Sequence, residues 1–221
     1  MKKIFPVLFI LSLCIGLSAC SKKSNSLEGG GIADWSEERP LHSFHSIILN
    51  GSSDVYIHAS TDYRAVVNGS EELVSHFETR VENGVLILQF PDGYRVYHNN
   101  VTIDVYTPAI HDIKINGSAS AVLNSGFTGK NLRIKINGSG SFETQNNNYE
   151  NLFPIINGSG NMDTRLIHAK TVIAEISGSG GIYCSVADLL KARIQGSGTI
   201  DYWGSPATDI EISGSGKVKK H

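Results

Sequence analysis

Hydrophobic and polar residues alternate in the second half of the chain, and this alternation recurs about every twenty residues. Gly-Ser-Gly or a close variant begins at Gly117, Gly138, Gly158, Gly178, Gly196 and Gly214, so the spacings are 21, 20, 20, 18 and 18 residues. A weaker copy begins at Gly51. A repeat of this length cannot bury an apolar face alone. Stacking of successive copies solves this problem and is typical of solenoid proteins.

An isoleucine precedes each glycine of the six repeats by two residues. These isoleucines are Ile115, Ile136, Ile156, Ile176, Ile194 and Ile212. The positions four residues before and four residues after each glycine are mostly apolar as well, and even offsets are the side-chain period of a β-strand. The pattern predicts strands that stack in register, with the six isoleucines as a buried column that forms the structural core.

Charged and polar residues occupy most of the odd offsets, which should face outward. Stacking in register would place Asp112 opposite Arg133 and Lys191 opposite Asp209, so we expect opposite charges to pair between coils. Asparagines precede several of the repeat glycines in Asn-Gly-Ser sequons. We interpret them as turn residues that hydrogen-bond from coil to coil, not as glycosylation sites.

The first half of the domain repeats less clearly. It contains expected strands, a short helical turn and a hairpin around Asn83-Gly84. These elements are Asp54–His58, Arg64–Val67, Glu71–Phe77, Glu78–Phe90 and Val101–Tyr106. We interpret residues 36–110 as irregular coils that precede the regular coils of residues 111–216. Residues 36–221 are thus predicted to form one all-β domain, a β-helix or β-solenoid with coils of about 18–21 residues.

A separate segment precedes this domain. Two lysines and an apolar run over residues 4–17 have the pattern of a signal sequence and are too short to span a bilayer. Leu17-Ser18-Ala19-Cys20 follows, and small residues before a cysteine at this point resemble a bacterial lipobox. We predict a lipoprotein signal peptide over residues 1–19, lipidation of Cys20 by palmitate, and a flexible tether over residues 20–35.

Composition and motifs argue against several classes of function. The net charge of −2 argues against nucleic acid as a partner. With Cys14 in the signal peptide and Cys20 lipidated, only Cys184 remains, at an inward position typical of an inert core residue. Motifs for a nucleophilic serine or a phosphate loop are missing, the histidines are scattered, and the acidic residues are distributed as pairs between coils. We predict no catalytic residue, no metal and no cofactor.

One departure from the repeat is a candidate partner-binding patch. Phe153, Ile155 and Ile173 stand at odd offsets, where neighbouring repeats carry charges. If the register holds, they form an exposed apolar patch suited to a partner or a second subunit. The alternative is that Pro154 introduces a bulge and that a loop covers these residues.

A second departure is the polar and aromatic stretch of residues 91–100. We interpret it as a candidate ligand loop, in which Tyr94, Arg95 and Tyr97 stack on a sugar or a peptide. The alternative is an ordinary connecting loop.

Three stretches, Arg39–Ile57, Glu82–Phe90 and Val101–Leu123, precede the I-x-G-S-G repeats. Together they resemble the auto-transporter adhesin "head GIN" domain family of lipoproteins, which is common in Bacteroidetes. The resemblance covers about residues 36–216. It implies a right-handed β-helix and a location in the cell envelope, and it implies no enzymatic activity. The family offers no agreed functional residues to carry over.

These observations predict a non-enzymatic, lipid-anchored envelope protein that binds a protein or a glycan. The alternatives are a periplasmic scaffold in envelope maintenance or stress sensing, and a carbohydrate-active enzyme. Surface-exported lipoproteins of Bacteroidetes carry acidic residues after the lipidated cysteine, whereas Lys22 and Lys23 stand there in this chain. The periplasmic face of the outer membrane is therefore favoured over the cell surface. The sequence is compatible with a homo-oligomer. The charges of Lys217, Lys219 and Lys220 on the last strand should discourage end-to-end stacking of two molecules.

Overall fold

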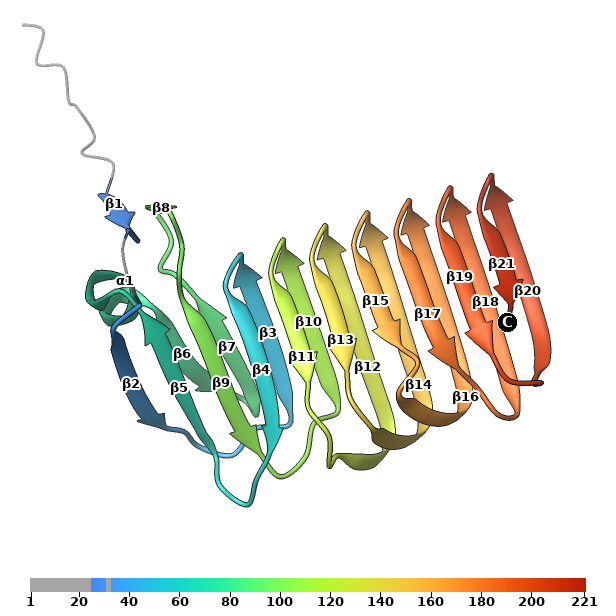
Figure 1. Ribbon diagram of the computed structural model, residues 1–221, viewed down its shortest axis with the longest axis horizontal. Helices are drawn as coiled ribbons and strands as arrows, with labels where there is room; N and C mark the ends of the chain where they lie inside the picture. Colours follow the sequence, from blue (N-terminus) through green and yellow to red (C-terminus); the bar gives the residue numbers. More distant parts are fainter. Residues whose placement is uncertain (1–24, 31–32) are drawn as a thin grey trace, which may run out of the picture.

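The computed structural model describes residues 25–30 and 33–221 as two facing β-sheets that enclose one elongated core (Figure 1). The chain passes from one sheet to the other in every coil, and successive coils stack along the long axis. The predicted signal peptide and Cys20 lie outside the described residues. The predicted β-solenoid is confirmed.

Each regular coil contributes one strand to each sheet. The pairs are β3 (Ser46–Gly51) and β4 (Asp54–Ala59), β10 (Asp112–Gly117) and β11 (Ser120–Leu123), β12 (Thr128–Gly138) and β13 (Ser141–Thr144), β14 (Asn147–Gly158) and β15 (Asn161–Thr164), β16 (Ile167–Gly178) and β17 (Gly181–Ser185), β18 (Leu189–Gly196) and β19 (Thr199–Trp203), and β20 (Ala207–Gly214) and β21 (Lys217–Lys220). Every strand pairs in parallel with its counterpart in the next coil.

The remaining elements lie at the N-terminal end. They are β1 (Asn25–Glu28), β2 (Trp35–Pro40), β5 (Arg64–Gly69), α1 (Glu71–His76), β6 (Glu78–Glu82), β7 (Val85–Gln89), β8 (Tyr94–Tyr97) and β9 (Thr102–Thr107). The nine-stranded sheet has the order β20-β18-β16-β14-β12-β10-β3-β7-β6 and the ten-stranded sheet the order β2-β5-β9-β4-β11-β13-β15-β17-β19-β21, while β1 and β8 form a small sheet of their own.

The first half of the domain differs from the prediction of irregular coils. The pair β3 and β4 is a regular coil in register with β10 and β11, and β7 and β9 add to it in parallel. Beyond them, β6, β5 and β2 pair antiparallel to their neighbours. The tight turn at Asn83 and Gly84, both with positive φ, makes β6 return beside β7. Strands β2, β5 and β6 therefore form an antiparallel end piece, whereas β3, β4, β7 and β9 continue the parallel stacking of the coils.

The predicted column of isoleucines runs through the core. The isoleucines are partners in register from β10 to β20, and all but the last are at most 1% exposed. Burial of each such side chain contributes about 1.5–3 kcal/mol. The prediction was wrong for Ile212, which is 42% exposed because β20 is the last strand of its sheet and no further coil covers it.

Glycine is needed at the corners because successive coils approach closely there. Gly158 has a φ of +136°, and a Cβ at this position would lie 2.3 Å from the carbonyl oxygen of Gly138 in the preceding coil. A Cβ on Gly160 would lie 2.8 Å from Cγ2 of Ile136. The intervening serine remains exposed while its amide hydrogen-bonds the preceding coil, as Ser159 does to Gly138 at 3.0 Å.

The corner asparagines form the predicted ladder between coils. Each side-chain amide donates to the side-chain oxygen on the next strand towards the α1 end of the solenoid, from Asn157 to Asn137 (2.9 Å), Asn137 to Asn116 (2.8 Å), Asn116 to Asn50 (2.7 Å), Asn50 to Gln89 (2.7 Å) and Gln89 to Glu78 (3.2 Å). The chain of amides thus ends on a carboxylate, which can only accept hydrogen bonds when ionised. Of the two predicted charge pairs, Arg133 lies 3.5 Å from Asp112, whereas Lys191 and Asp209 are partners in register without an ion pair between them.

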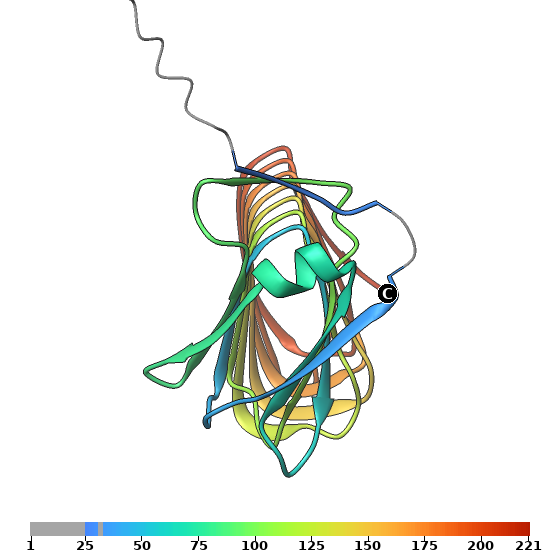
Figure 2. The same ribbon diagram turned by 90° about the vertical axis from the view of Figure 1, so that its left-hand side faces the viewer.

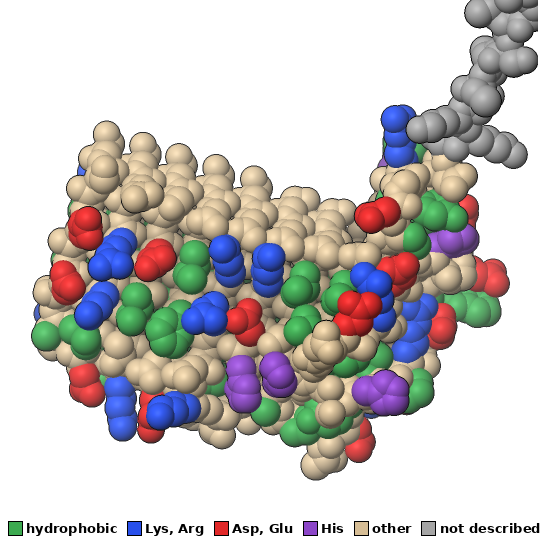
Figure 3. All heavy atoms as spheres, turned by 180° about the vertical axis from the view of Figure 1, so that it is seen from behind, with side chains coloured by type: hydrophobic (Ala, Val, Ile, Leu, Met, Phe, Trp, Pro, Cys, Tyr) green, Lys and Arg blue, Asp and Glu red, His purple; other side chains and the backbone are tan. Residues whose placement is uncertain are grey.

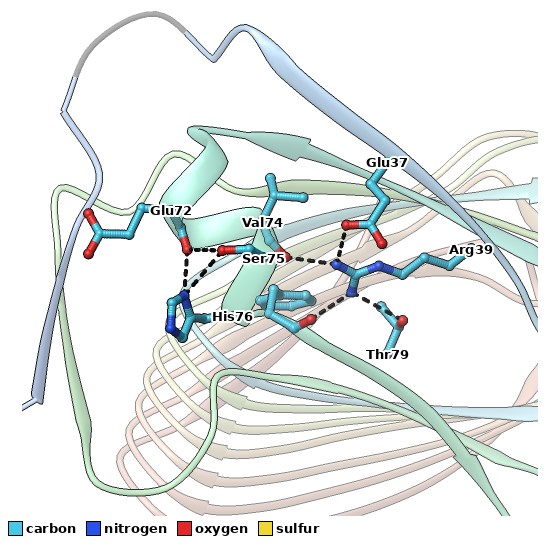
Figure 4. Close-up of polar contacts among 8 residues, drawn as sticks. Glu37, Arg39, Glu72, Val74, Ser75, His76 and Thr79 are labelled. Atoms are coloured by element: carbon cyan, nitrogen blue, oxygen red, sulfur yellow. Dashed lines mark hydrogen bonds and ion pairs between the residues drawn. The ribbon is translucent and has the colours of Figure 1, made fainter.

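Helix α1 covers the core at the N-terminal end (Figure 2), where Leu73 and Val74 are fully buried. Arg39 of β2 holds the end of this helix (Figure 4). Its guanidinium donates to the carbonyl oxygens of Val74 at 2.7 Å and Phe77 at 2.6 Å, and to Glu37 at 2.9 Å. The hydrogen bond from Arg39 also lowers the pKa of the Glu37 carboxyl. Arg39 therefore adds hydrogen bonds to carbonyl groups at the C-terminal end of the helix, where the Val74 carbonyl also accepts from the Phe77 amide at 3.2 Å.

We expect Gly158→Ala to lower the free energy of unfolding by about 3 kcal/mol, because an added Cβ meets backbone and the φ is unfavourable for alanine. The matched control is the adjacent Ser159→Ala, which should stay within about 0.5 kcal/mol of the wild type. Urea denaturation followed by circular dichroism measures both. Equal stability of the two variants would contradict the close approach at the corners.

Candidate functional site

Outward-facing side chains of the ten-stranded sheet form a row across the last coils. Glu143, Asp163, Tyr183, Asp201 and Lys219 are successive partners in register on β13 to β21. A hollow of about 330 Å³ lies over this row. We call it the aromatic hollow; it is lined by Ser141, Phe142, Glu143, Asn161, Asp163, Arg165, Tyr183, Asp201, Trp203 and His221.

Gly181 lies beside the aromatic hollow, next to the Tyr183 ring. The equivalent position in neighbouring coils carries Asn161 or Thr199, whereas a Cβ on Gly181 would lie 2.9 Å from Oδ1 of Asn161 and 3.6 Å from the ring of Tyr183. The Tyr183 ring therefore lies beside Gly181, at an ordinary contact distance, and the only close neighbour of such a Cβ would be the Asn161 side chain. The ring is 38% exposed, so it presents an aromatic surface on the sheet.

A cation and a second aromatic ring lie beside Tyr183. The Arg165 guanidinium carbon is 5.9 Å from the centre of the Tyr183 ring and 5.3 Å from the Trp203 ring, within the range of cation–π attraction. Trp203 in turn stacks on His221 with a centroid distance of 4.5 Å. Two aromatic side chains, an arginine and a histidine are thus brought together from four successive coils.

Two carboxylates in the aromatic hollow orient Arg165 and His221 by hydrogen bonds. Arg165 Nε lies 2.9 Å from Oδ1 of Asp163, and Nη2 lies 2.5 Å from Oδ2. This fork of hydrogen bonds from Arg165 holds the pKa of the Asp163 carboxyl below its usual value. Asp201 is 7% exposed and accepts a hydrogen bond from Nε2 of His221 at 2.7 Å. The result is a rigid polar surface in which both partners of each pair are oriented.

The carboxylates are closer together than the sequence indicated. Glu143, Asp163 and Asp201 line one hollow, so the prediction that acidic residues occur only as pairs between coils was wrong. The chemistry of a general acid requires a carboxyl with a raised pKa, whereas the pKa of Asp163 is lowered. Among residues 25–30 and 33–221, no group of three or more His, Cys, Asp or Glu side chains is placed to hold a metal ion.

A larger apolar groove lies at the edge opposite the glycine corners. Its volume is about 670 Å³, and it shares Trp203 with the aromatic hollow. Tyr149 and Val186 line it, while His168 and Lys170 lie on its polar side. The Tyr149 hydroxyl donates to the carbonyl oxygen of Ile110 at 3.0 Å, and burial raises its pKa. We call this feature the apolar groove.

The predicted partner-binding patch lies on the outer face of the nine-stranded sheet. Phe153, Ile155 and Ile173 are partly buried there, and Figure 3 shows hydrophobic side chains among charged ones on this face. Pro154 is buried and makes no bulge, because β14 and β16 keep the same register on both sides of it. Arg133 lies 5.6 Å from the centre of the Phe153 ring. A role for this patch in binding stays a prediction.

The predicted ligand loop is part of a sheet. Tyr94, Arg95 and Tyr97 belong to β8, which pairs in parallel with β1. Leu27 of β1 is 2% exposed, so the prediction of a flexible tether over residues 20–35 was wrong for Asn25–Glu28. Backbone pairing, not a free loop, positions the two tyrosines. Arg95 and Tyr97 remain exposed, and their role in binding stays a prediction.

Cys184 lies in the core as its inward position predicted. It is fully buried. Burial, together with the nearby charge of Asp201, raises the pKa of its thiol to about 12. The thiolate is therefore scarce at neutral pH, and the residue lacks the reactivity of a functional cysteine.

Sequence reasoning missed the aromatic hollow, although a signal was present. Asp163, Tyr183 and Asp201 all stand five residues after the glycine of their repeat, and Arg165 and Trp203 stand seven residues after it. These are odd offsets, so the side chains had to share one outward face.

None of the helices in the described residues is long and apolar enough to cross a membrane.

Comparison with solved structures shows the same fold at low sequence identity. A "putative adhesin" from Bacteroides fragilis has a TM-score of 0.67 at 21% identity, covering 85% of this chain and 96% of its own. A "putative adhesin" from Parabacteroides merdae has a TM-score of 0.60 at 18% identity, covering 89% and 99%. A "putative lipid binding protein" from Parabacteroides distasonis has a TM-score of 0.56 at 19% identity, covering 89% and 100%.

Comparison with curated proteins gives no match. A family model matches residues 43–154 and again 144–206, and thus most of the solenoid. Its description is "Putative auto-transporter adhesin, head GIN domain". The resemblance inferred from the repeats is confirmed: the chain belongs to the auto-transporter adhesin head GIN domain family.

Proposed function

We propose that this protein is a non-enzymatic, lipid-anchored protein of the cell envelope that binds a glycan in the aromatic hollow. The observation that carries the proposal is the exposed Tyr183 ring beside the oriented pairs Asp163–Arg165 and Asp201–His221. Small ligand sites commonly combine an apolar or aromatic surface with a few fixed polar groups, in cavities of about 300–1,000 Å³. The hollow, at about 330 Å³, is of a size for one or two sugar rings.

The chemistry of a sugar ring suits this arrangement. One face of a pyranose is lined by C–H groups, which pack on an aromatic ring, while its hydroxyls are donors and acceptors. Carboxylate oxygens accept strong hydrogen bonds from hydroxyls, and the guanidinium of Arg165 donates them. Because Asp163 already holds Arg165, little side-chain freedom is lost on binding. Family membership supports an adhesin-like role.

A second candidate function is the binding of an acyl chain in the apolar groove. Its large volume and its lining by Tyr149, Ala169 and Val186 favour this ligand. One solved structure of the same fold is described as a "putative lipid binding protein". His168 and Lys170 at the groove would then face a negatively charged headgroup.

The location follows from the N-terminal sequence. Acylation of Cys20 would attach the solenoid to the outer membrane, and Lys22 and Lys23 favour its periplasmic face. A periplasmic scaffold in envelope maintenance or stress sensing would share this location, but it would not require a glycan in the hollow. A carbohydrate-active enzyme would require that the bound glycan be cleaved during incubation.

The glycan proposal predicts a loss of binding in Tyr183→Ala. Removal of the ring should weaken binding by about tenfold, because stacking contributes about 0.5–1.5 kcal/mol beyond the buried area. A glycan array identifies a bound sugar, and quenching of Trp203 fluorescence in a Trp35→Phe background measures its affinity. The matched control is Tyr56→Ala on the same sheet, since Tyr56 is 39% exposed and Tyr183 is 38% exposed. Equal affinities of the two variants, or no bound glycan, would contradict the proposal.

The anchor proposal predicts that Cys20→Ser moves the protein from the membrane fraction to the soluble fraction, because the acyl chains supply the membrane affinity. Fractionation and immunoblotting of cells measure the distribution. Protease added to intact cells should leave the wild type uncut until the outer membrane is permeabilised. Membrane association of Cys20→Ser would exclude the anchor, and cleavage on intact cells would place the domain on the surface.

A further inference from the structure

The two ends of the solenoid differ in how the apolar interior is covered. At the N-terminal end, α1 closes the core with the fully buried Leu73 and Val74. At the other end, β20 and β21 are the last strands of their sheets, and no described strand pairs with their outer edges. The inward-facing Ile210 and Ile212 of β20 are 45% and 42% exposed. This end therefore offers an apolar surface and two rows of unpaired backbone groups, as an edge strand does.

The two edge strands carry opposite charges on their outward positions. Strand β20 carries Asp209 and Glu211, whereas β21 carries Lys217 and Lys219. Among residues 25–30 and 33–221, only Arg193 forms an ion pair with one of these four residues, at 3.3 Å from Glu211. One edge of the open end is thus acidic and the other is basic.

A two-fold arrangement of two copies matches these edges. Strand β20 runs towards the corner at Ser215 and β21 runs away from it, so the two strands run in opposite directions. A two-fold axis parallel to the strands would therefore lay β21 of a second copy antiparallel beside β20, and both sheets would continue into the second copy. Residues at equal distance from Ser215 would then lie opposite one another. Glu211 would lie opposite Lys219, and Asp209 opposite His221, which are favourable cross-strand pairs.

The same arrangement covers the exposed core. Ile212 would lie opposite Val218 of the second copy, and Ile210 would pack beside the aliphatic stem of Lys220. A two-fold axis in the other direction across the solenoid would instead lay β20 against β20. That pairing would bring Asp209 and Glu211 together with their counterparts, and like charges on opposite strands are destabilising.

We propose that two copies of this protein join end to end through β20 and β21 as an antiparallel, two-fold symmetric dimer. The lysines of β21 oppose pairing of β21 with itself, but they favour its pairing with β20. The assembly stops at two copies, because α1 and the antiparallel strands occupy the other end of each solenoid. A two-fold contact that uses the same surface on both copies closes in this way. This proposal is independent of any ligand in the aromatic hollow.

Ser213 provides a sharp test, because it would lie opposite Lys217 of the second copy and has the neutral Gln195 as its partner within the chain. Ser213→Lys should weaken the dimer about threefold to tenfold and Ser213→Glu should strengthen it by a similar factor, since each change acts on two symmetric pairs. The full chain carrying Cys20→Ser, which removes the predicted acylation site, is measured by sedimentation equilibrium over a range of concentrations.

The matched controls are Ser177→Lys and Ser177→Glu, at the same place in an inner coil where both neighbouring strands are paired. They should leave the dimer constant unchanged, and unfolding midpoints verify that all four variants remain folded. The proposal is supported if the wild type is a dimer and the two Ser213 variants shift its constant in opposite directions. A monomeric wild type, a dimer indifferent to both Ser213 changes, or open-ended polymers would overturn it.

Discussion

Close backbone contact between successive corners is the constraint on which the rest of this structure depends. The carbonyl oxygen of one corner glycine occupies the space where a Cβ of the next would lie, at 2.3 Å for Gly138 and Gly158. At the same corner the Ser159 amide hydrogen-bonds that oxygen. These contacts hold the strands at their usual spacing of about 4.8 Å, and they keep every coil in the same register. The column of isoleucines, the ladder of asparagines and the rows of outward side chains all follow from that register.

The inward half of the architecture could be predicted from the sequence, because six repeats impose the same requirement at the same even offset. The isoleucine two residues before each glycine is such a requirement, and its burial failed only at Ile212, in the last described strand of its sheet. The N-terminal elements could be recognised as strands and a helical turn, but their antiparallel pairing could not. Pairing between distant strands is not written in the pattern of one segment. Strand β1, in a short polar stretch, has a single buried residue, Leu27, and therefore no periodicity to detect.

The aromatic hollow was harder to predict for a different reason. Outward positions have no shared requirement, so each repeat carries a different residue there, and the chemistry appears only when several coils are read together. Arg165 and Trp203 are separated by two repeats, yet the register brings the guanidinium to 5.3 Å from the ring. Tyr183 lies in the coil between them, with its ring centre 5.9 Å from the same guanidinium. A solenoid thus keeps its interior uniform and lets its surface vary, and the aromatic hollow lies on that surface.

The account depends on the alternation between inward and outward residues, and neighbouring isoleucines in β14 test it most directly. Ile156 is fully buried, whereas Ile155 faces outward and is partly exposed. Ile156→Asp should lower the free energy of unfolding by about 4 kcal/mol or more, since it places an unpaired charge in the core. Ile155→Asp, opposite Lys135 in the adjacent strand, should change it by less than about 1 kcal/mol. Urea denaturation of the two variants measures the difference. Equal stability of the two, or greater stability of Ile156→Asp, would contradict the register on which the solenoid is built.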